Sequence, residues 1–135
     1  MIAVDTSALF AILAHEPEEL LFLEVLNDNQ AVISSMTWLE AFVVITSRIG
    51  DDGGQALRDL LEDAGVSHVP FDAAQAAAAF DAFRRFGKGQ GHPAQLNFGD
   101  CAAYALARTR NLPLLFKGED FAKTDVRSAV GEAGG

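Results

Sequence analysis

The stretch MIAVDTSALFAIL, residues 1–13, has the pattern of a short apolar strand that passes into a helix at a single carboxylate. Residues 2–4 are wholly apolar, which is typical of a strand buried on both faces. We expect a strand over residues 2–4 and a helix over residues 7–14. Asp5 lies between them, either as the cap of that helix or as part of a site at the end of the strand.

The rest of the chain repeats this alternation of short apolar strands with helices. Further strands are expected at residues 31–34, 66–70 and 113–116, with an edge strand starting at Val126. Helices are expected at residues 16–26, 37–49, 51–64, 72–86 and 100–111, with a glycine-rich loop at 87–99 and a helical turn at Phe121. This alternation predicts an α/β fold with a central parallel sheet covered by helices on both faces. Ligands of such sheets bind beyond the carboxyl ends of the strands.

Length and composition are those of one small domain. The chain has 135 residues, half of them hydrophobic, and we expect one domain over residues 1–130 and a flexible tail over 131–135. No apolar run is long enough to span a membrane, and no basic segment precedes the apolar start as in a signal peptide. The single Cys101 is expected to be a buried apolar residue and suits a reducing, cytoplasmic setting.

Four carboxylates are expected at one edge of the predicted sheet. Asp5 and Asp120 follow strands, Asp100 opens a helix, and Glu40 lies early in the helix after the second strand. Each alone has an ordinary explanation: a helix cap for Asp5 and Asp100, a turn for Asp120, and solvent exposure for Glu40. Together they would repel one another unless cations bound between them. Ligands that are all oxygen favour Mg²⁺ or Mn²⁺ over Zn²⁺.

Four segments that contain these acids resemble the PIN-domain ribonucleases and, more narrowly, the VapC toxins of bacterial toxin–antitoxin pairs. They are VDTSAL at residues 4–9, SSMTWLEA at 34–41, HPAQLNFGDCAAYALA at 92–107 and PLLFKGEDFAKTDV at 113–126. The motif DTSA alone is weak evidence. All four segments in this order and at this spacing make the resemblance specific, and it covers residues 1–126.

The resemblance implies a three-layer α/β/α fold and an endoribonuclease that depends on Mg²⁺ or Mn²⁺. It also implies inhibition by a cognate VapB antitoxin and, usually, a homodimer. Carried over by motif, Asp5, Glu40, Asp100 and Asp120 form the catalytic and metal-binding set. Asp5 and Asp100 would be the principal ligands, and Glu40 and Asp120 would complete the site directly or through water.

Several further residues have roles that the sequence leaves open. Thr6 and Ser7 either orient Asp5 or cap the first helix. A net charge of −9 argues against a general nucleic-acid-binding surface, so RNA contacts would be local. We expect these contacts from a set of basic residues near the site, which would otherwise form a solvated face: Arg84, Arg85, Lys88, Lys117 and Lys123. Apolar residues within 19–26 and 38–45 offer surfaces for a second copy or an antitoxin helix.

Three other functions fit the sequence less well. A haloacid dehalogenase-like phosphatase needs a second Asp two residues after the first, where this chain has Ser7. A response-regulator receiver needs a phosphoacceptor Asp at the end of the third strand, where the chain reads His68-Val69-Pro70-Phe71. A binding module without catalysis would not need the complete set of acids.

Overall fold

Strands and helices alternate along the chain, as the sequence predicts. The computed structural model describes residues 1–131; residues 132–135, most of the predicted tail, lie outside the described residues. The elements in chain order are β1 (Ile2–Val4), α1 (Thr6–Leu13), α2 (Glu19–Asp28), β2 (Ala31–Ser34), α3 (Ser35–Ile49), α4 (Asp51–Asp63), β3 (Ser67–Val69), α5 (Ala73–Phe86), α6 (Phe98–Thr109), β4 (Leu114–Leu115) and the 3₁₀ turn η1 (Phe121–Lys123).

The four strands form one parallel sheet in the order β3-β2-β1-β4. The first strand therefore lies inside the sheet, where Ile2 aligns with Ala31 of β2 and Val4 aligns with Leu115 of β4. All three residues of β1 are buried. The prediction of a central parallel sheet is confirmed.

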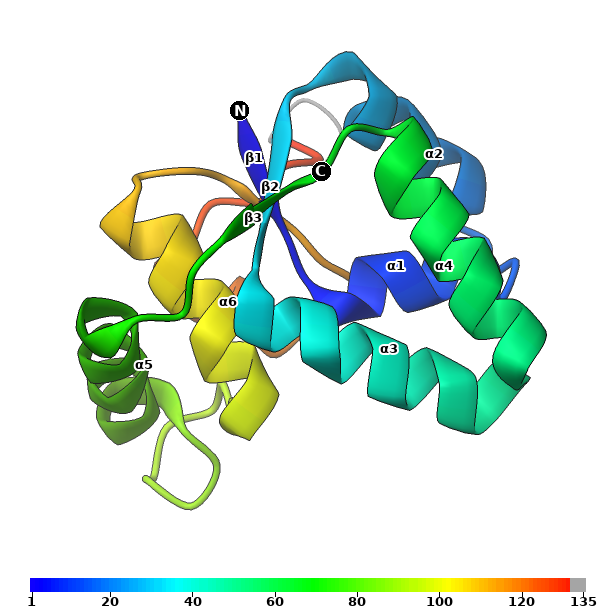
Figure 1. Ribbon diagram of the computed structural model, residues 1–135. Coiled ribbons are helices and arrows are strands. Elements are labelled where there is room, and N and C mark those ends of the chain that lie inside the picture. The colour runs from blue at the N-terminus through cyan, green and yellow to red at the C-terminus, as the bar shows by residue number, and fades with distance from the viewer. Residues whose placement is uncertain (132–135) are drawn as a thin grey trace.

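Successive apolar residues of β1, β2 and β4 belong to different apolar cores, one on each face of the sheet. Ala3 packs in a core with α5 and α6, whereas Ile2 and Val4 pack in a second core with α1, α2, α3 and α4. This division follows from the two-residue period of a strand. Figure 1 shows the two groups of helices on opposite sides of the strands, which confirms the three-layer α/β/α architecture.

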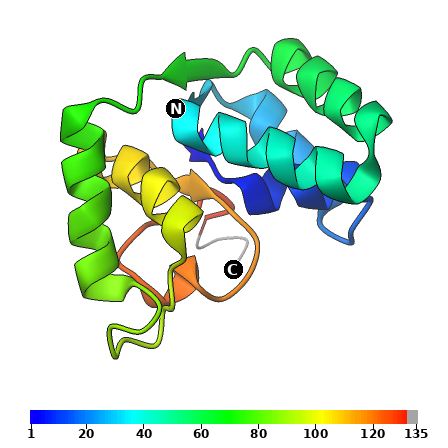
Figure 2. The same cartoon turned by 60° about the horizontal axis from the view of Figure 1, so that its bottom comes forward.

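Helices begin directly at the carboxyl ends of the two central strands. Asp5 caps α1 immediately after β1, and the Ser34 hydroxyl caps α3 by accepting the Met36 N–H at 3.2 Å. Because both strands are parallel, the first turns of α1 and α3 lie at one edge of the sheet. In Figure 2 these two helices run side by side away from that edge.

Two predicted helix starts shift because a side chain caps the helix earlier than expected, whereas α2 starts at Glu19 rather than at residue 16 and has no side-chain cap. The cap at Ser34 starts α3 at Ser35 rather than at residue 37, and an Asn97 cap starts α6 at Phe98. The strand predicted from Val126 is wrong: this segment makes a single bridge between Leu114 and Ser128. No helix within residues 1–131 is both long and apolar enough to cross a membrane.

A candidate metal centre at the carboxyl end of the sheet

Asp5 is a helix cap that still has one unused oxygen. Its backbone is extended, its Oδ2 accepts the Ser7 N–H at 2.9 Å, and the residue is only 2 % exposed. Its Oδ1 is also buried and has no hydrogen-bond partner among residues 1–131. An unpartnered buried carboxylate oxygen is costly. Capping therefore accounts for Oδ2 of Asp5, whereas Oδ1 is available to bind a ligand.

The surroundings of Asp5 disfavour its negative charge. Burial raises the pKa of Asp5 to about 7, the hydrogen bonds from Ser7 oppose this rise, and the charges of Asp100 and Glu40 add to it. The three acids are therefore close enough to influence one another electrostatically. A cation bound beside Asp5 would relieve both the burial cost and the repulsion.

Glu40 is held between two helices that begin at this edge. The Thr6 hydroxyl at the start of α1 donates to Glu40 Oε1 at 2.5 Å. On the other side α6 approaches so closely that a Cβ placed on Gly99 would lie 1.8 Å from Glu40 Oε2. Thr6 therefore orients Glu40 and not Asp5, which is instead held by the Ser7 backbone. The requirement for glycine at residue 99 was not foreseen, because no local pattern shows which side chain passes over a helical glycine.

Asp100 lies in the first turn of α6 and takes part in its cap. Asn97 is the cap residue: its side chain accepts the Asp100 N–H at 2.8 Å, and Asp100 Oδ2 accepts the Asn97 N–H at 2.9 Å. Burial raises the pKa of Asp100 to about 6, in spite of the Asn97 hydrogen bond, and the charges of Glu40 and Asp120 raise it further. The negative charges of both neighbours therefore act on the Asp100 carboxylate.

Asp120 is the most open of the four acids. It is exposed and directly precedes η1, beyond the end of β4. Its charge raises the pKa of Asp100, so the two carboxylates face the same region. The structure therefore brings Asp5, Glu40 and Asp100 together and places Asp120 beside Asp100.

The four carboxylates do not form a complete metal cage. Within the described part of the chain, no three Asp, Glu, His or Cys side chains are arranged to hold an ion by themselves. A hard cation such as Mg²⁺ is usually held by one or two carboxylates and keeps several of its waters. The residues fit such an ion, because the donors are all oxygen and Asp5 Oδ1 is buried without a partner.

Two of the basic residues expected to contact RNA form ion pairs with acidic residues of the same chain. The Lys117 ammonium lies 3.2 Å from Glu16 Oε1 and 3.1 Å from Glu18 Oε1, and the Lys117 N–H donates to the Ser7 hydroxyl at 3.0 Å. Arg85 lies 3.4 Å from Asp125 Oδ2. RNA contact by the basic set stays a prediction, and it would compete with these ion pairs.

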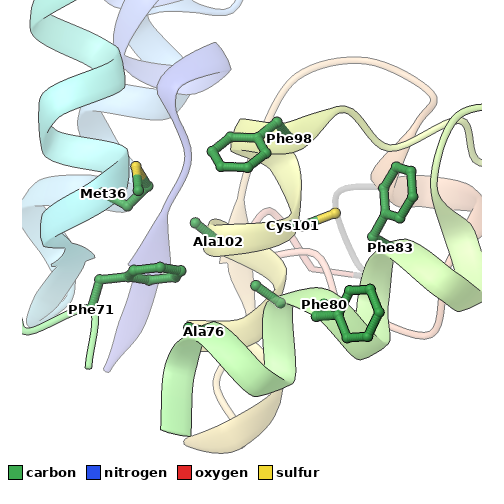
Figure 3. Close-up of a pocket in the computed structure, with 9 residues that line it drawn as sticks. Met36, Phe71, Ala76, Phe80, Phe83, Phe98, Cys101 and Ala102 are labelled. Atoms are coloured by element: carbon green, nitrogen blue, oxygen red, sulfur yellow. The ribbon is translucent and has the colours of Figure 1, made fainter. Parts of the chain in front are cut away.

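An apolar surface borders the acidic edge. Phe98, 81 % exposed, lines both a cavity of about 420 Å³ and a neighbouring hollow of about 430 Å³ that reaches Glu40. Figure 3 shows aromatic side chains from α5 and α6 around the first cavity, whose lining includes Met36, Phe71, Phe80, Phe83 and Cys101.

Burial raises the pKa of the Cys101 thiol to about 11, and the nearby Asp100 charge adds to this. Cys101 is buried, as the sequence predicts, and its raised pKa disfavours the reactive thiolate form.

Comparison with known proteins by sequence gives one family. The PIN domain family matches residues 2–127. The chain is 52 % identical to "Ribonuclease VapC" of Mycolicibacterium smegmatis over 91 % of this chain and 95 % of that one. It is 44 % identical to "Ribonuclease VapC30" of Mycobacterium tuberculosis, over 94 % of this chain and 97 % of that one.

Two solved structures share the fold at low sequence identity. The crystal structure of Mycobacterium tuberculosis VapC20, titled a Sarcin-Ricin loop cleaving toxin, aligns with a TM-score of 0.76 at 16 % identity and covers 93 % of this chain and 96 % of that one. A toxin–antitoxin complex from Klebsiella pneumoniae aligns with a TM-score of 0.70 at 20 % identity over 96 % and 98 %.

Proposed function

Because the chain belongs to the PIN-domain family and, within it, to the VapC ribonucleases, we propose that it hydrolyses RNA phosphodiester bonds with Mg²⁺ or Mn²⁺ held by Asp5, Glu40, Asp100 and Asp120. One observation carries the proposal. Carboxylates from three segments that are distant in sequence meet at the sheet edge, and two of them are buried enough to have a raised pKa. Without a bound cation, the burial and mutual repulsion of these charges would destabilise the folded protein.

Each acid has a distinct part in this proposal. Asp5 offers its unpartnered Oδ1, and Asp100 offers a second carboxylate from the facing helix. Glu40, oriented by the Thr6 hydroxyl, and the exposed Asp120 complete the site directly or through water. A divalent cation bound there would activate water for attack and stabilise charge on the phosphate. No serine or cysteine nucleophile is required.

Cleavage of RNA by the purified chain tests this function. Wild type should cleave in Mg²⁺ or Mn²⁺ and stop in EDTA, and Asp100→Asn should lower the rate by at least a hundredfold. Asp72→Asn is a matched control, because Asp72 also accepts an N–H at a helix start but lies in the exposed cap of α5. Activity that persists in EDTA, or in Asp100→Asn, would show that the acids are not the catalytic centre.

We also propose that this toxin acts in the cytoplasm and is inhibited by a VapB-type antitoxin. The solved relatives include toxin–antitoxin complexes. Large apolar side chains stay exposed on two separate surfaces of residues 1–131, which suits a second copy and an antitoxin helix: Leu20 and Leu21 on α2, and Leu39, Val43, Phe80 and Phe98 on α3, α5 and α6. A basic side chain of the antitoxin would complement the acidic edge.

Partner binding is tested by the mass of the particles in solution. Light scattering on the chain alone should give a homodimer, and Val43→Asp, which places a charge on the exposed apolar face of α3, should give a monomer. Co-expression with the cognate antitoxin should yield a complex that no longer cleaves RNA. A wild-type monomer would contradict the dimer, and a complex with full activity would contradict the inhibition.

A further inference from the structure

The segment that carries Asp120 has little regular structure of its own. Between β4 and the end of the described chain, η1 is the single helical element, and it spans three residues. Asp120 itself is exposed. Its position beside Asp100 therefore depends on contacts made by its neighbours in the segment 116–127.

One anchor of this segment is apolar. Phe121, the residue after Asp120, is 3 % exposed and its ring lies 5.3 Å from that of Phe116. The Thr124 hydroxyl closes the turn that follows by donating to the Phe121 carbonyl at 2.7 Å. These contacts bury the segment in the apolar core that also contains residues of α6, but none of them is a polar contact to that helix.

The second anchor is polar and does reach that helix. Asp125 Oδ1 accepts a short hydrogen bond from the hydroxyl of Tyr104, which is buried in α6. Asp125 Oδ2 lies 3.4 Å from Arg85 of α5 and 3.8 Å from Arg108 of α6. Tyr104 is four residues after Asp100, so both lie on one side of α6. The segment thus contacts α6 through Asp125, on the side of the helix where Asp100 is influenced by the charge of Asp120.

The hydrogen bond from Tyr104 is the strongest part of this polar anchor. Burial raises the pKa of Tyr104 to about 12, and its bond to Asp125 adds to this. Burial raises the pKa of Asp125 too, but the Tyr104 bond and the two arginines outweigh it and lower the pKa overall. Asp125 is therefore charged and Tyr104 is protonated around neutral pH. The two arginine pairs are about half exposed and contribute little.

We propose that Asp125 is a positioning residue for the metal centre: through the Tyr104 hydroxyl it fixes the segment 116–127 on α6 so that Asp120 stays beside Asp100. Asp125 itself touches neither metal nor RNA in this role. The inference rests on the proposed function, because it assigns a structural cause to the place of one of the four acids. Residues that orient metal ligands in this way commonly change metal affinity ten- to a hundredfold when they are removed.

Direct binding of Mn²⁺ to the purified chain, followed by electron paramagnetic resonance, tests the inference. Tyr104→Phe removes one hydroxyl and keeps the buried ring, and Asp125→Ala removes the whole polar anchor. Each should raise the Kd for Mn²⁺ about tenfold. RNA cleavage should then need more Mn²⁺ but return to the wild-type rate at saturation. Asp72→Ala, which removes an exposed carboxylate that caps α5, should leave the Kd for Mn²⁺ unchanged.

A second readout needs no metal. In EDTA, the backbone amides of residues 117–126 should exchange with solvent faster in Tyr104→Phe than in wild type, whereas amides of α6 should not change. Tyr104→Phe is the informative variant if Asp125→Ala fails to fold. Unchanged exchange, or an unchanged Kd in Tyr104→Phe where wild type binds Mn²⁺, would overturn the positioning role. Wild type that binds no Mn²⁺ would instead contradict the proposed function.

Discussion

The substitution Asp5→Asn should stabilise the metal-free protein although it destroys the proposed centre. The folded protein holds the pKa of Asp5 at about 7, whereas an unfolded Asp titrates near 3.8. Between these values the folded chain keeps a proton that the unfolded chain loses, so stability falls as pH rises through this window. Once pH exceeds 7, the full penalty is about 4 kcal/mol.

Asparagine carries no charge and so removes this penalty, but it introduces a smaller cost of its own. Its Oδ1 can still accept the Ser7 N–H, whereas its amide NH₂ takes the place of the buried, unpartnered oxygen. A buried donor without a partner costs about 1–2 kcal/mol, which leaves a net gain of about 2–3 kcal/mol at pH 8. For a chain of this length that gain corresponds to a rise in Tm of roughly 10 °C.

Urea and thermal unfolding in EDTA at pH 8 and near pH 4 measure the effect. The penalty on wild type is under about 1 kcal/mol at pH 4, so the advantage of Asp5→Asn should disappear there. Asp72→Asn, at the exposed cap of α5, should be neutral at both pH values because Asn and Asp are equally good caps. If Asp5→Asn were no more stable than wild type at pH 8, or equally favoured at both pH values, the reasoning from buried charge would be refuted.

Four further predictions concern the same edge of the sheet. Gly99→Ala should push the Glu40 carboxylate aside and lower cleavage at least tenfold with little loss of helicity in α6, measured by cleavage rate and circular dichroism. Thr6→Val should weaken Mn²⁺ binding about tenfold, because Glu40 loses the hydroxyl that orients it, and Thr6→Ser should restore it. Mg²⁺ at a hundred times its Kd should stabilise wild type by about 2.7 kcal/mol and leave Asp5→Asn unchanged in thermal melts. Protons compete with the metal for Asp5 and Asp100, so the Kd for Mn²⁺ should rise steeply as pH falls from 7 to 5 in titrations that are followed by electron paramagnetic resonance.

The sequence predicted the fold well because its strands are short, apolar and separated by capped helices. Residues 2–4 and 31–33 are wholly apolar, and residues 31–34 became a strand with the predicted bounds. The strand predicted from Val126 failed because pairing at an edge depends on which neighbour is in reach, and only one bridge to Leu114 forms. Helix starts moved by a few residues where Ser34 and Asn97 act as caps, since several polar residues near each start could have served.

The positions of the candidate acids at the sheet edge were predictable, but their contacts were not. Parallel strands bring their ends to one edge, so Asp5, Glu40 and Asp100 could be placed there from their positions in the chain. The pairing of Thr6 with Glu40 could not, because it depends on how two helices approach each other. The Tyr104–Asp125 contact was missed for the same reason, since Asp125 lies in a segment with no regular pattern.

Whether these carboxylates bind a metal ion is measured by titrating Mn²⁺ into wild type and Asp100→Asn at pH 7.5 and monitoring the free ion by electron paramagnetic resonance. We expect saturable binding to wild type and a loss of at least tenfold in affinity in Asp100→Asn, while Asp72→Asn binds as wild type does. Equal binding by wild type and Asp100→Asn, or none by wild type at millimolar Mn²⁺, would contradict the assignment of these carboxylates as a metal centre.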